Sequence, residues 1–149
     1  MRSLILLGTL LLTFNLVTSL TVVAQSQSTW DVLSRVSFDS PRGINRNYET
    51  AKPIFSDAIL VLEGEEVTLE GYIYPLESKL ATQHFVLSAM PLNACFFCGK
   101  AGPETVIEVY SQFLISYTRK KIKLRGTFRL NSDDPMGIMY KLYDAEEVR

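Results

Sequence analysis

The chain has 149 residues and a formal net charge of −1 at pH 7, with 15 basic against 16 acidic side chains. A near-neutral chain without a long basic block lacks the electrostatic surface that nucleic-acid-binding proteins need, so we expect no nucleic acid among its partners. The length is sufficient for one domain of ordinary size and too short for two.

The N-terminal segment has the pattern of a signal peptide. Arg2 precedes an apolar stretch over residues 4–20, and small side chains follow at residues 22–24. The strongly apolar part of this stretch is shorter than the roughly 20 residues that a membrane-spanning helix requires. We therefore expect residues 1–24 to be a signal peptide cleaved after Ala24. This predicts a periplasmic or secreted protein with no membrane span after cleavage.

Residues 25–64 are predicted to form an N-terminal arm with short helices. Thr29 can cap a first helical turn that includes Trp30, which we expect to be a packing anchor. Ser56 can cap a second short helix that Gly64 ends, with an extended segment as the alternative.

In the middle of this arm, apolar residues do not recur at the regular spacing of a helix or a strand. Turn-forming residues are frequent over residues 37–52, among them Pro41 and Gly43. This composition predicts irregular structure.

From residue 65 onward, apolar and polar residues alternate, which predicts strands with one buried face. The connection over residues 110–120 lies where barrels of this size often carry a helix. Turn formers at residues 131–135 separate the last two strands. We expect five strands, over residues 67–74, 83–90, 105–110, 122–130 and 139–145.

Two glycines indicate how these strands are arranged. Gly71 and Gly126 occupy the third inward-facing position of the first and fourth expected strands. A glycine inside a strand is costly unless the strand bends sharply or another backbone comes close. Five short antiparallel strands with two such bends predict a mainly β protein with a small five-stranded OB-like barrel over residues 65–149. A β-sandwich is the alternative.

Some of these motifs resemble an uncharacterised family of exported bacterial proteins with an OB-like barrel. The resemblance rests on Trp30, on the Pro-x-Phe-Ser-Asp element at residues 53–57, and above all on Gly-Tyr-Ile-Tyr-Pro-Leu-Glu at residues 71–77 followed by Cys95. It implies a periplasmic or secreted location and a link to metal handling, with a transporter component as a partner. This chain departs from the family's pattern after Cys95, where Phe97 and Cys98 replace a histidine and a proline-rich stretch.

Cys95 and Cys98 are the only cysteines, and Gly99 follows them directly. Two thiols at this spacing can form a disulfide, transfer electrons or bind a soft metal ion. An oxidising compartment favours the disulfide. A thioredoxin-like site is disfavoured because a loop, and not a helix, is expected after Cys98.

The metal-binding interpretation requires further ligands. A closed zinc site has four ligands, and the conceivable set is Cys95, Cys98, His84 and Glu104, of which His84 is the only histidine of the chain. Cu(I) is satisfied by two thiolates, with Met90 in support.

The sequence therefore predicts an exported accessory or binding protein that binds zinc or Cu(I) through Cys95 and Cys98, and no catalytic residue is assigned. One alternative is a disulfide-stapled interaction module, and another is a thiol–disulfide oxidoreductase. The module would bind a protein, peptide or glycan through exposed aromatic side chains. The candidates for that surface are Tyr72, Tyr74, Phe96 and Phe97.

Overall fold

The computed structural model describes residues 28–39, 52–131, 134 and 137–148. The expected signal peptide and most of the segment 37–52 lie outside the described residues. Among the residues that are described, no helix is long and apolar enough to cross a membrane.

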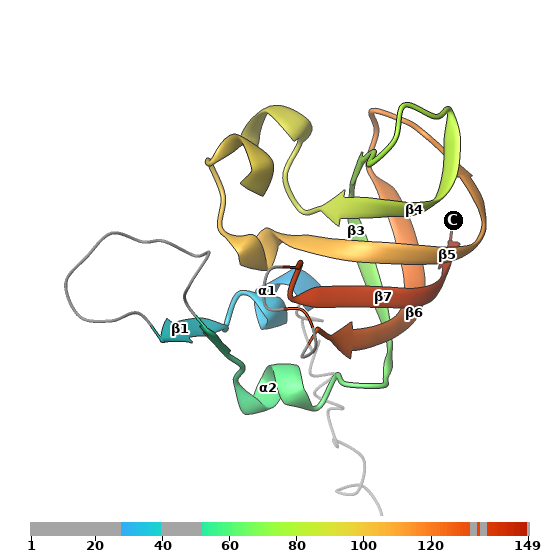
Figure 1. Ribbon diagram of the computed structural model, residues 1–149. Helices are drawn as coiled ribbons and strands as arrows, with labels where there is room; N and C mark the ends of the chain where they lie inside the picture. The colour runs from blue at the N-terminus through green and yellow to red at the C-terminus, as the bar shows by residue number, and fades with distance from the viewer. Residues whose placement is uncertain (1–27, 40–51, 132–133, 135–136, 149) are drawn as a thin grey trace, which may run out of the picture.

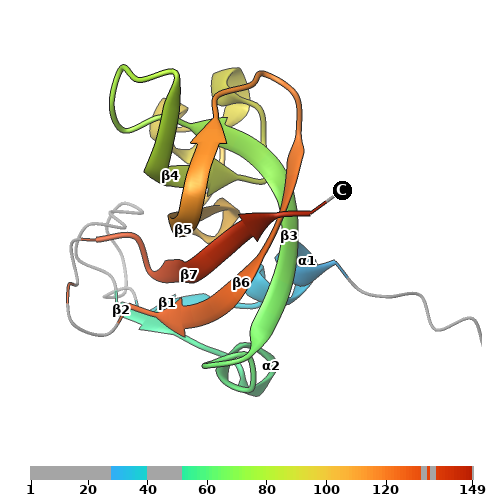
Figure 2. The ribbon, with the colours of Figure 1, turned by 90° about the vertical axis from the view of Figure 1, so that its right-hand side faces the viewer.

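Five strands close into a barrel, in the order β3-β4-β5-β7-β6 around it (Figures 1 and 2). This confirms the expected mainly β fold with a small OB-like barrel. The strands are β3 (Glu66–Tyr74), β4 (Ala81–Ser88), β5 (Val106–Ser116), β6 (Ile122–Leu130) and β7 (Tyr140–Glu147).

One pair of strands differs from the all-antiparallel expectation. β7 lies between β5 and β6, pairing antiparallel with β6 and parallel with β5. The reason is the closure of the barrel: β6 pairs antiparallel with β3, so β7 runs in the same direction as β3 and β5.

The inward faces of β3 and β6 follow the predicted alternation. Every second residue is buried from Val67 to Ile73 on β3 and from Ile122 to Phe128 on β6. These side chains fill the barrel together with apolar residues of the other three strands. The period of two in the sequence is thus the pleat of a sheet with one face on the core.

Gly71 and Gly126 allow neighbouring strands to approach closely, as expected. A Cβ at Gly71 would lie 2.5 Å from the carbonyl oxygen of Ser88, and a Cβ at Gly126 would lie 2.7 Å from that of Tyr143. Both distances are shorter than any real contact, and both involve backbone that cannot easily move. The glycines are therefore required by the tight coiling of the barrel.

The alternation predicted for β4 fails at its end. With strict alternation Val86 and Ser88 would face outward, opposite Phe85 and Leu87, but all four are fully buried. The outer face is covered here because the connection after β4 folds back over it, with Phe97 packed on Tyr74, the cross-strand partner of Val86.

The prediction of a helix over residues 110–120 is wrong, because most of this segment belongs to β5. β5 continues to Ser116 and pairs with the start of β4 through Ala81 and Thr82. The side chain of Gln83 also donates to the carbonyl oxygen of Gln112, at 2.9 Å. Because partners on β4 satisfy the backbone of this segment, an extended strand replaces the helix.

Two short helices form in the arm, as predicted. α1 (Thr29–Leu33) has Ser28, and not Thr29, at its N-cap. The indole nitrogen of Trp30 donates to the carbonyl oxygen of Glu70, at 2.9 Å, and the ring packs against the barrel core, which confirms its role as an anchor.

The second helix is α2 (Asp57–Leu60), with Ser56 at its N-cap position. The capping bond expected from the Ser56 hydroxyl does not form: this oxygen is buried without a hydrogen-bond partner among the described residues. The irregular structure expected over 37–52 is wrong at both ends of that segment, where β1 (Ser37–Asp39) and β2 (Lys52–Ile54) pair antiparallel.

Candidate functional site

The two cysteines lie in the connection between β4 and β5, which consists of three short 3₁₀ turns (Figure 1). η1 (Leu92–Ala94) and η2 (Phe96–Cys98) precede η3 (Pro103–Thr105). The second turn is closed by a hydrogen bond from the Cys98 amide to the Cys95 carbonyl oxygen, at 3.1 Å. Gly99 ends it with a φ of +68°, a conformation that favours glycine. The Cys-x-x-Cys-Gly motif is thus a tight turn that brings two thiols together.

The two sulfur atoms differ in exposure and lie close together. Cys95 is fully buried, whereas Cys98 is exposed. Their Sγ atoms are 3.9 Å apart. A disulfide bond is about 2.05 Å long, so the two sulfurs lie beyond bonding distance in this structure.

The surroundings of Cys98 favour its protonated form. The hydrogen bond with Cys95 raises the pKa of the Cys98 thiol, with smaller contributions from burial and from the charge on Cys95, while Lys100 acts in the opposite direction. The exposed cysteine of a thiol oxidoreductase has a lowered pKa, because the thiolate is the attacking species. This environment is therefore unlike that of a redox-active cysteine.

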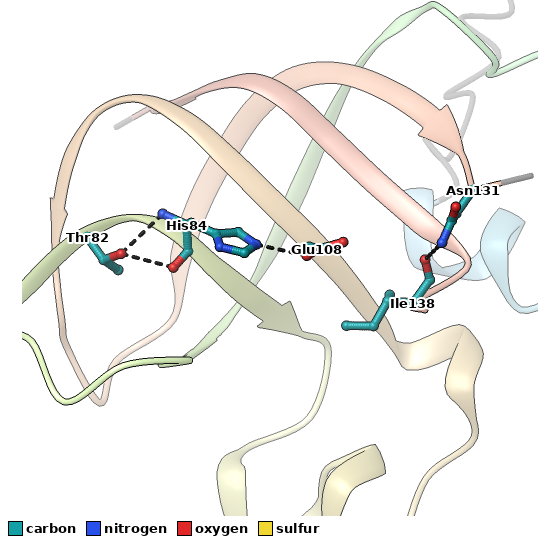
Figure 3. A network of polar contacts seen from close by, with 5 residues as sticks. All are labelled: Thr82, His84, Glu108, Asn131 and Ile138. Carbon is teal, nitrogen blue, oxygen red and sulfur yellow. Dashed lines mark hydrogen bonds and ion pairs between the residues drawn. The ribbon is translucent and has the colours of Figure 1, made fainter. Parts of the chain in front are cut away.

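The structure does not bring His84 into the cysteine site. Its Nε2 lies 2.8 Å from Oε1 of Glu108 on β5, as Figure 3 shows, and its ring stacks on Tyr110. His84 is four residues from Ser88, the end of β4 that leads into the cysteine loop, which corresponds to about 13 Å along a strand. The sequence placed His84 close to the cysteines, but its imidazole lies midway along β4 and not at the end that leads into the cysteine loop.

Glu104 also does not complete a ligand set with the cysteines among the described residues. Its carboxylate packs against Gly102. Burial raises the pKa of Tyr140, and the charge on Glu104 adds to this effect. Among the described residues, no group of three or more His, Cys, Asp or Glu side chains could hold a metal ion.

Three of the four aromatic residues expected at a partner surface form one cluster beside the thiols. The Phe97 ring lies 4.4 Å from that of Tyr74 and 5.5 Å from that of Phe96, measured between centroids. Tyr72 is separate from them and lies under Lys121, whose Nζ is 5.7 Å from the ring centroid.

A second set of rings was not anticipated from the sequence. His84 on β4, Tyr110 on β5 and Tyr143 on β7 form a continuous stack on the outside of the barrel. The signal in the sequence is an outward-facing ring on each of three strands, but only the strand order β4-β5-β7 makes these rings neighbours.

No protein family model matches the chain, and no curated protein matches it either. A solved structure of a DUF3299 family protein from Pseudomonas aeruginosa is similar, with 17% sequence identity and a TM-score of 0.49. The match covers 80% of this chain and 93% of the other chain. We draw no functional argument from a similarity at this level.

Proposed function

We propose that the protein is an exported accessory protein that binds one soft metal ion, zinc or Cu(I), through the thiolates of Cys95 and Cys98. The observation that carries this proposal is the distance of 3.9 Å between the two Sγ atoms. The pattern of residues 1–24 supports a periplasmic or secreted location.

The sulfur separation fits a shared metal ion. Zinc–sulfur bonds are about 2.3 Å long, and two such bonds at the tetrahedral angle hold their sulfurs about 3.8 Å apart. Binding would require loss of the thiol protons, and it would replace the hydrogen bond between the two sulfurs.

The chain supplies fewer than four ligands to a metal ion at the cysteine turn, and this affects the role that the site can have. Cys95 and Cys98 supply two ligands. His84 contacts Glu108 instead, and among the described residues no carboxylate joins the two thiols in a group of three that could hold a metal ion. Two thiolates are sufficient for Cu(I), whereas zinc would take its other ligands from solvent or from a partner. Because Cys98 is exposed, the bound ion would be accessible to a second protein. This supports transfer to or from a partner, such as a transporter component.

A disulfide-stapled interaction module is the second candidate. It is favoured by the aromatic cluster of Tyr74, Phe96 and Phe97, which lies in and beside the cysteine turn. Phe97 remains 43% exposed, so a partner could contact it directly.

The test is a titration of the reduced mature chain with Zn²⁺ and with Cu(I) against a chelator of known affinity. We expect uptake of one ion with release of protons, and Cys95→Ser and Cys98→Ser should each abolish this uptake. His84→Ala and Glu104→Gln are the matched controls and should leave the affinity unchanged, because their side chains lie outside the turn.

Failure to bind either ion would overturn the metal proposal. If the reduced protein also exchanges readily with glutathione, with a potential well above about −300 mV, the protein is a thiol–disulfide oxidoreductase. A disulfide in protein taken from its native compartment, inert to glutathione, would instead establish the stapled module.

Export is tested separately by N-terminal sequencing of the protein from its native host. We expect the mature chain to begin at Gln25, and retention of Met1 would contradict the signal peptide.

A further inference from the structure

The stacked rings on the outside of the barrel have a regular geometry. The centroids of His84 and Tyr110 are 4.5 Å apart with an interplanar angle of 11°. Those of Tyr110 and Tyr143 are 4.9 Å apart with an angle of 7°. Because the three rings are nearly parallel and come from successive strands of the sheet, they form one row across β4, β5 and β7.

Polar contacts hold the first part of this row in place. His84 follows a bulge in β4, where the Thr82 hydroxyl accepts from the His84 amide at 3.1 Å and donates to its carbonyl oxygen at 2.9 Å (Figure 3). The imidazole is then oriented by Glu108. Burial, reinforced by Glu108, raises the pKa of Tyr110 to about 12, so the central phenol stays neutral. The row is therefore a rigid support for the Tyr143 ring.

The row of rings ends at Tyr143, although the sheet continues. The next strand is β6, and the residue paired with Tyr143 is Thr127, which has no ring. Tyr110 covers one face of the Tyr143 ring, so the other face is directed toward this threonine. A hollow of about 520 Å³ lies here, and its walls include Glu63, Thr127, Arg129, Lys141, Tyr143 and Asp144.

The polar groups around the hollow are balanced in charge. Two cations face two carboxylates, and Arg129 forms an ion pair with Glu63 at 3.2 Å. Asp144, directly after Tyr143, has a φ of +52°, which is uncommon for any residue other than glycine. Asp144 lies where the register of β7 shifts against both β5 and β6, so a bulge in β7 turns its side chain into the wall of the hollow.

We propose that this hollow binds one sugar ring of a neutral glycan, which stacks on the uncovered face of Tyr143 as the fourth member of the row. A sugar ring combines an apolar C–H face with a rim of hydroxyl groups that both donate and accept hydrogen bonds. The C–H face can stack on the ring of Tyr143. The hydroxyl groups can accept hydrogen bonds from Lys141 and Arg129 and donate one to Asp144. This site is independent of the cysteine turn.

Two other flat ligands, an aromatic side chain of a peptide and a nucleobase, fit this hollow less well than a sugar ring. An aromatic side chain of a peptide has few groups to replace the water around four charged side chains, and their desolvation would oppose binding. A nucleobase in a nucleic acid brings phosphates, for which the balanced charge of the hollow offers little attraction.

The test is a set of NMR titrations of the isotope-labelled mature chain. The probes are cellotetraose, chitotetraose and maltotetraose at up to about 10 mM, a range that detects weak binding. At least one of them should shift the amide signals of Thr127, Tyr143 and Asp144. Tyr143→Ala should raise the Kd for that sugar about tenfold or more.

A second variant keeps the proposal falsifiable if Tyr143→Ala unfolds the barrel. Thr127→Tyr supplies a fourth ring from the protein itself, so it should abolish sugar binding while the fold is retained. Phe113→Ala, which removes an exposed ring on β5 outside the hollow, is the matched control and should leave the Kd unchanged.

Two results would overturn the proposal. One is the absence of shifts at the hollow with all three sugars. The other is that N-acetyltryptophanamide shifts these signals and no sugar does, which would identify the hollow as a peptide site. Cys95→Ser should not change sugar binding, so the outcome is separable from that of the metal titration.

Discussion

The barrel and the cysteine loop hold their side chains in position by different means. In the barrel, continuous pairing of β3 with β6 from Glu66 to Gly71 determines which residues face each other. In the loop, each 3₁₀ turn is held by one or two local hydrogen bonds, such as that from the Gly99 amide to the Phe96 carbonyl oxygen, at 2.8 Å. A long ladder fixes contacts between distant segments, whereas short turns fix only local geometry.

The glycines of the two regions illustrate this difference. Gly71 is required because the backbone of the neighbouring strand leaves no room for a Cβ. A Cβ added at Gly99 would meet no atom within 4 Å, so glycine is required there because of its positive φ. One residue type therefore serves tertiary packing in the barrel and local conformation in the loop.

The largest expected effect comes from adding a side chain at the barrel glycines. Gly71→Val and Gly126→Val should each lower the free energy of unfolding by about 3 kcal/mol, because a backbone carbonyl must move to make room. Urea denaturation measures this change. An unchanged midpoint in either variant would contradict the tightly coiled barrel.

A smaller effect is expected in the loop. Gly99→Ala should cost about 1 to 2 kcal/mol, since no atom lies within 4 Å of the added Cβ and only the left-handed backbone is strained. Gly99→Asn should cost less, because asparagine adopts this conformation more readily. If both variants lose the same free energy of unfolding, the need for glycine at residue 99 comes from steric contacts of the added side chain and not from the positive φ.

Tyr140 joins the barrel to the arm through its hydroxyl group, and removal of this hydroxyl should change the free energy of unfolding in a pH-dependent way. Its hydroxyl donates to the carbonyl oxygen of Leu33, at 2.9 Å, so Tyr140→Phe should cost about 1 kcal/mol at neutral pH.

The pH dependence follows from the raised pKa of this phenol. Its ordinary value is 10.0, so above this pH the unfolded chain loses the proton while the folded chain retains it. The stability contributed by the protonated phenol is complete below pH 10 and declines as the pH rises toward the native pKa. Denaturation from pH 8 to 11 should therefore show a shallower alkaline loss for Tyr140→Phe, and parallel curves would contradict this assignment.

The smallest effect separates the two cysteines. Cys95→Ala should cost about 1 kcal/mol because its side chain is fully buried, whereas Cys98→Ala should cost under about 0.5 kcal/mol. Thermal denaturation of metal-free, reduced protein measures both. Equal losses would mean that the burial of Cys95 contributes little, and that the loop is held by its turns alone.

Much of the barrel could be predicted from the alternation of residues, but the connections between strands could not. The alternation identified β3 and β6 because each has one face in the core and one in solvent. It failed at the end of β4, where the cysteine loop covers the outer face, and at the end of β5, where pairing with β4 replaced the expected helix. Both failures arise from contacts between segments that are distant in the sequence.

The sequence by itself determined the alternation of β3 and β6, the need for Gly71 and Gly126, and the adjacency of Cys95 and Cys98, because each depends on nearby residues or on the requirements of one residue. Only the tertiary structure decided that His84 joins Glu108 and not the thiols, and that Tyr143 presents a face to the hollow over Thr127. These contacts depend on strand order and register, which arise when the barrel closes and a whole face of each strand is buried at once.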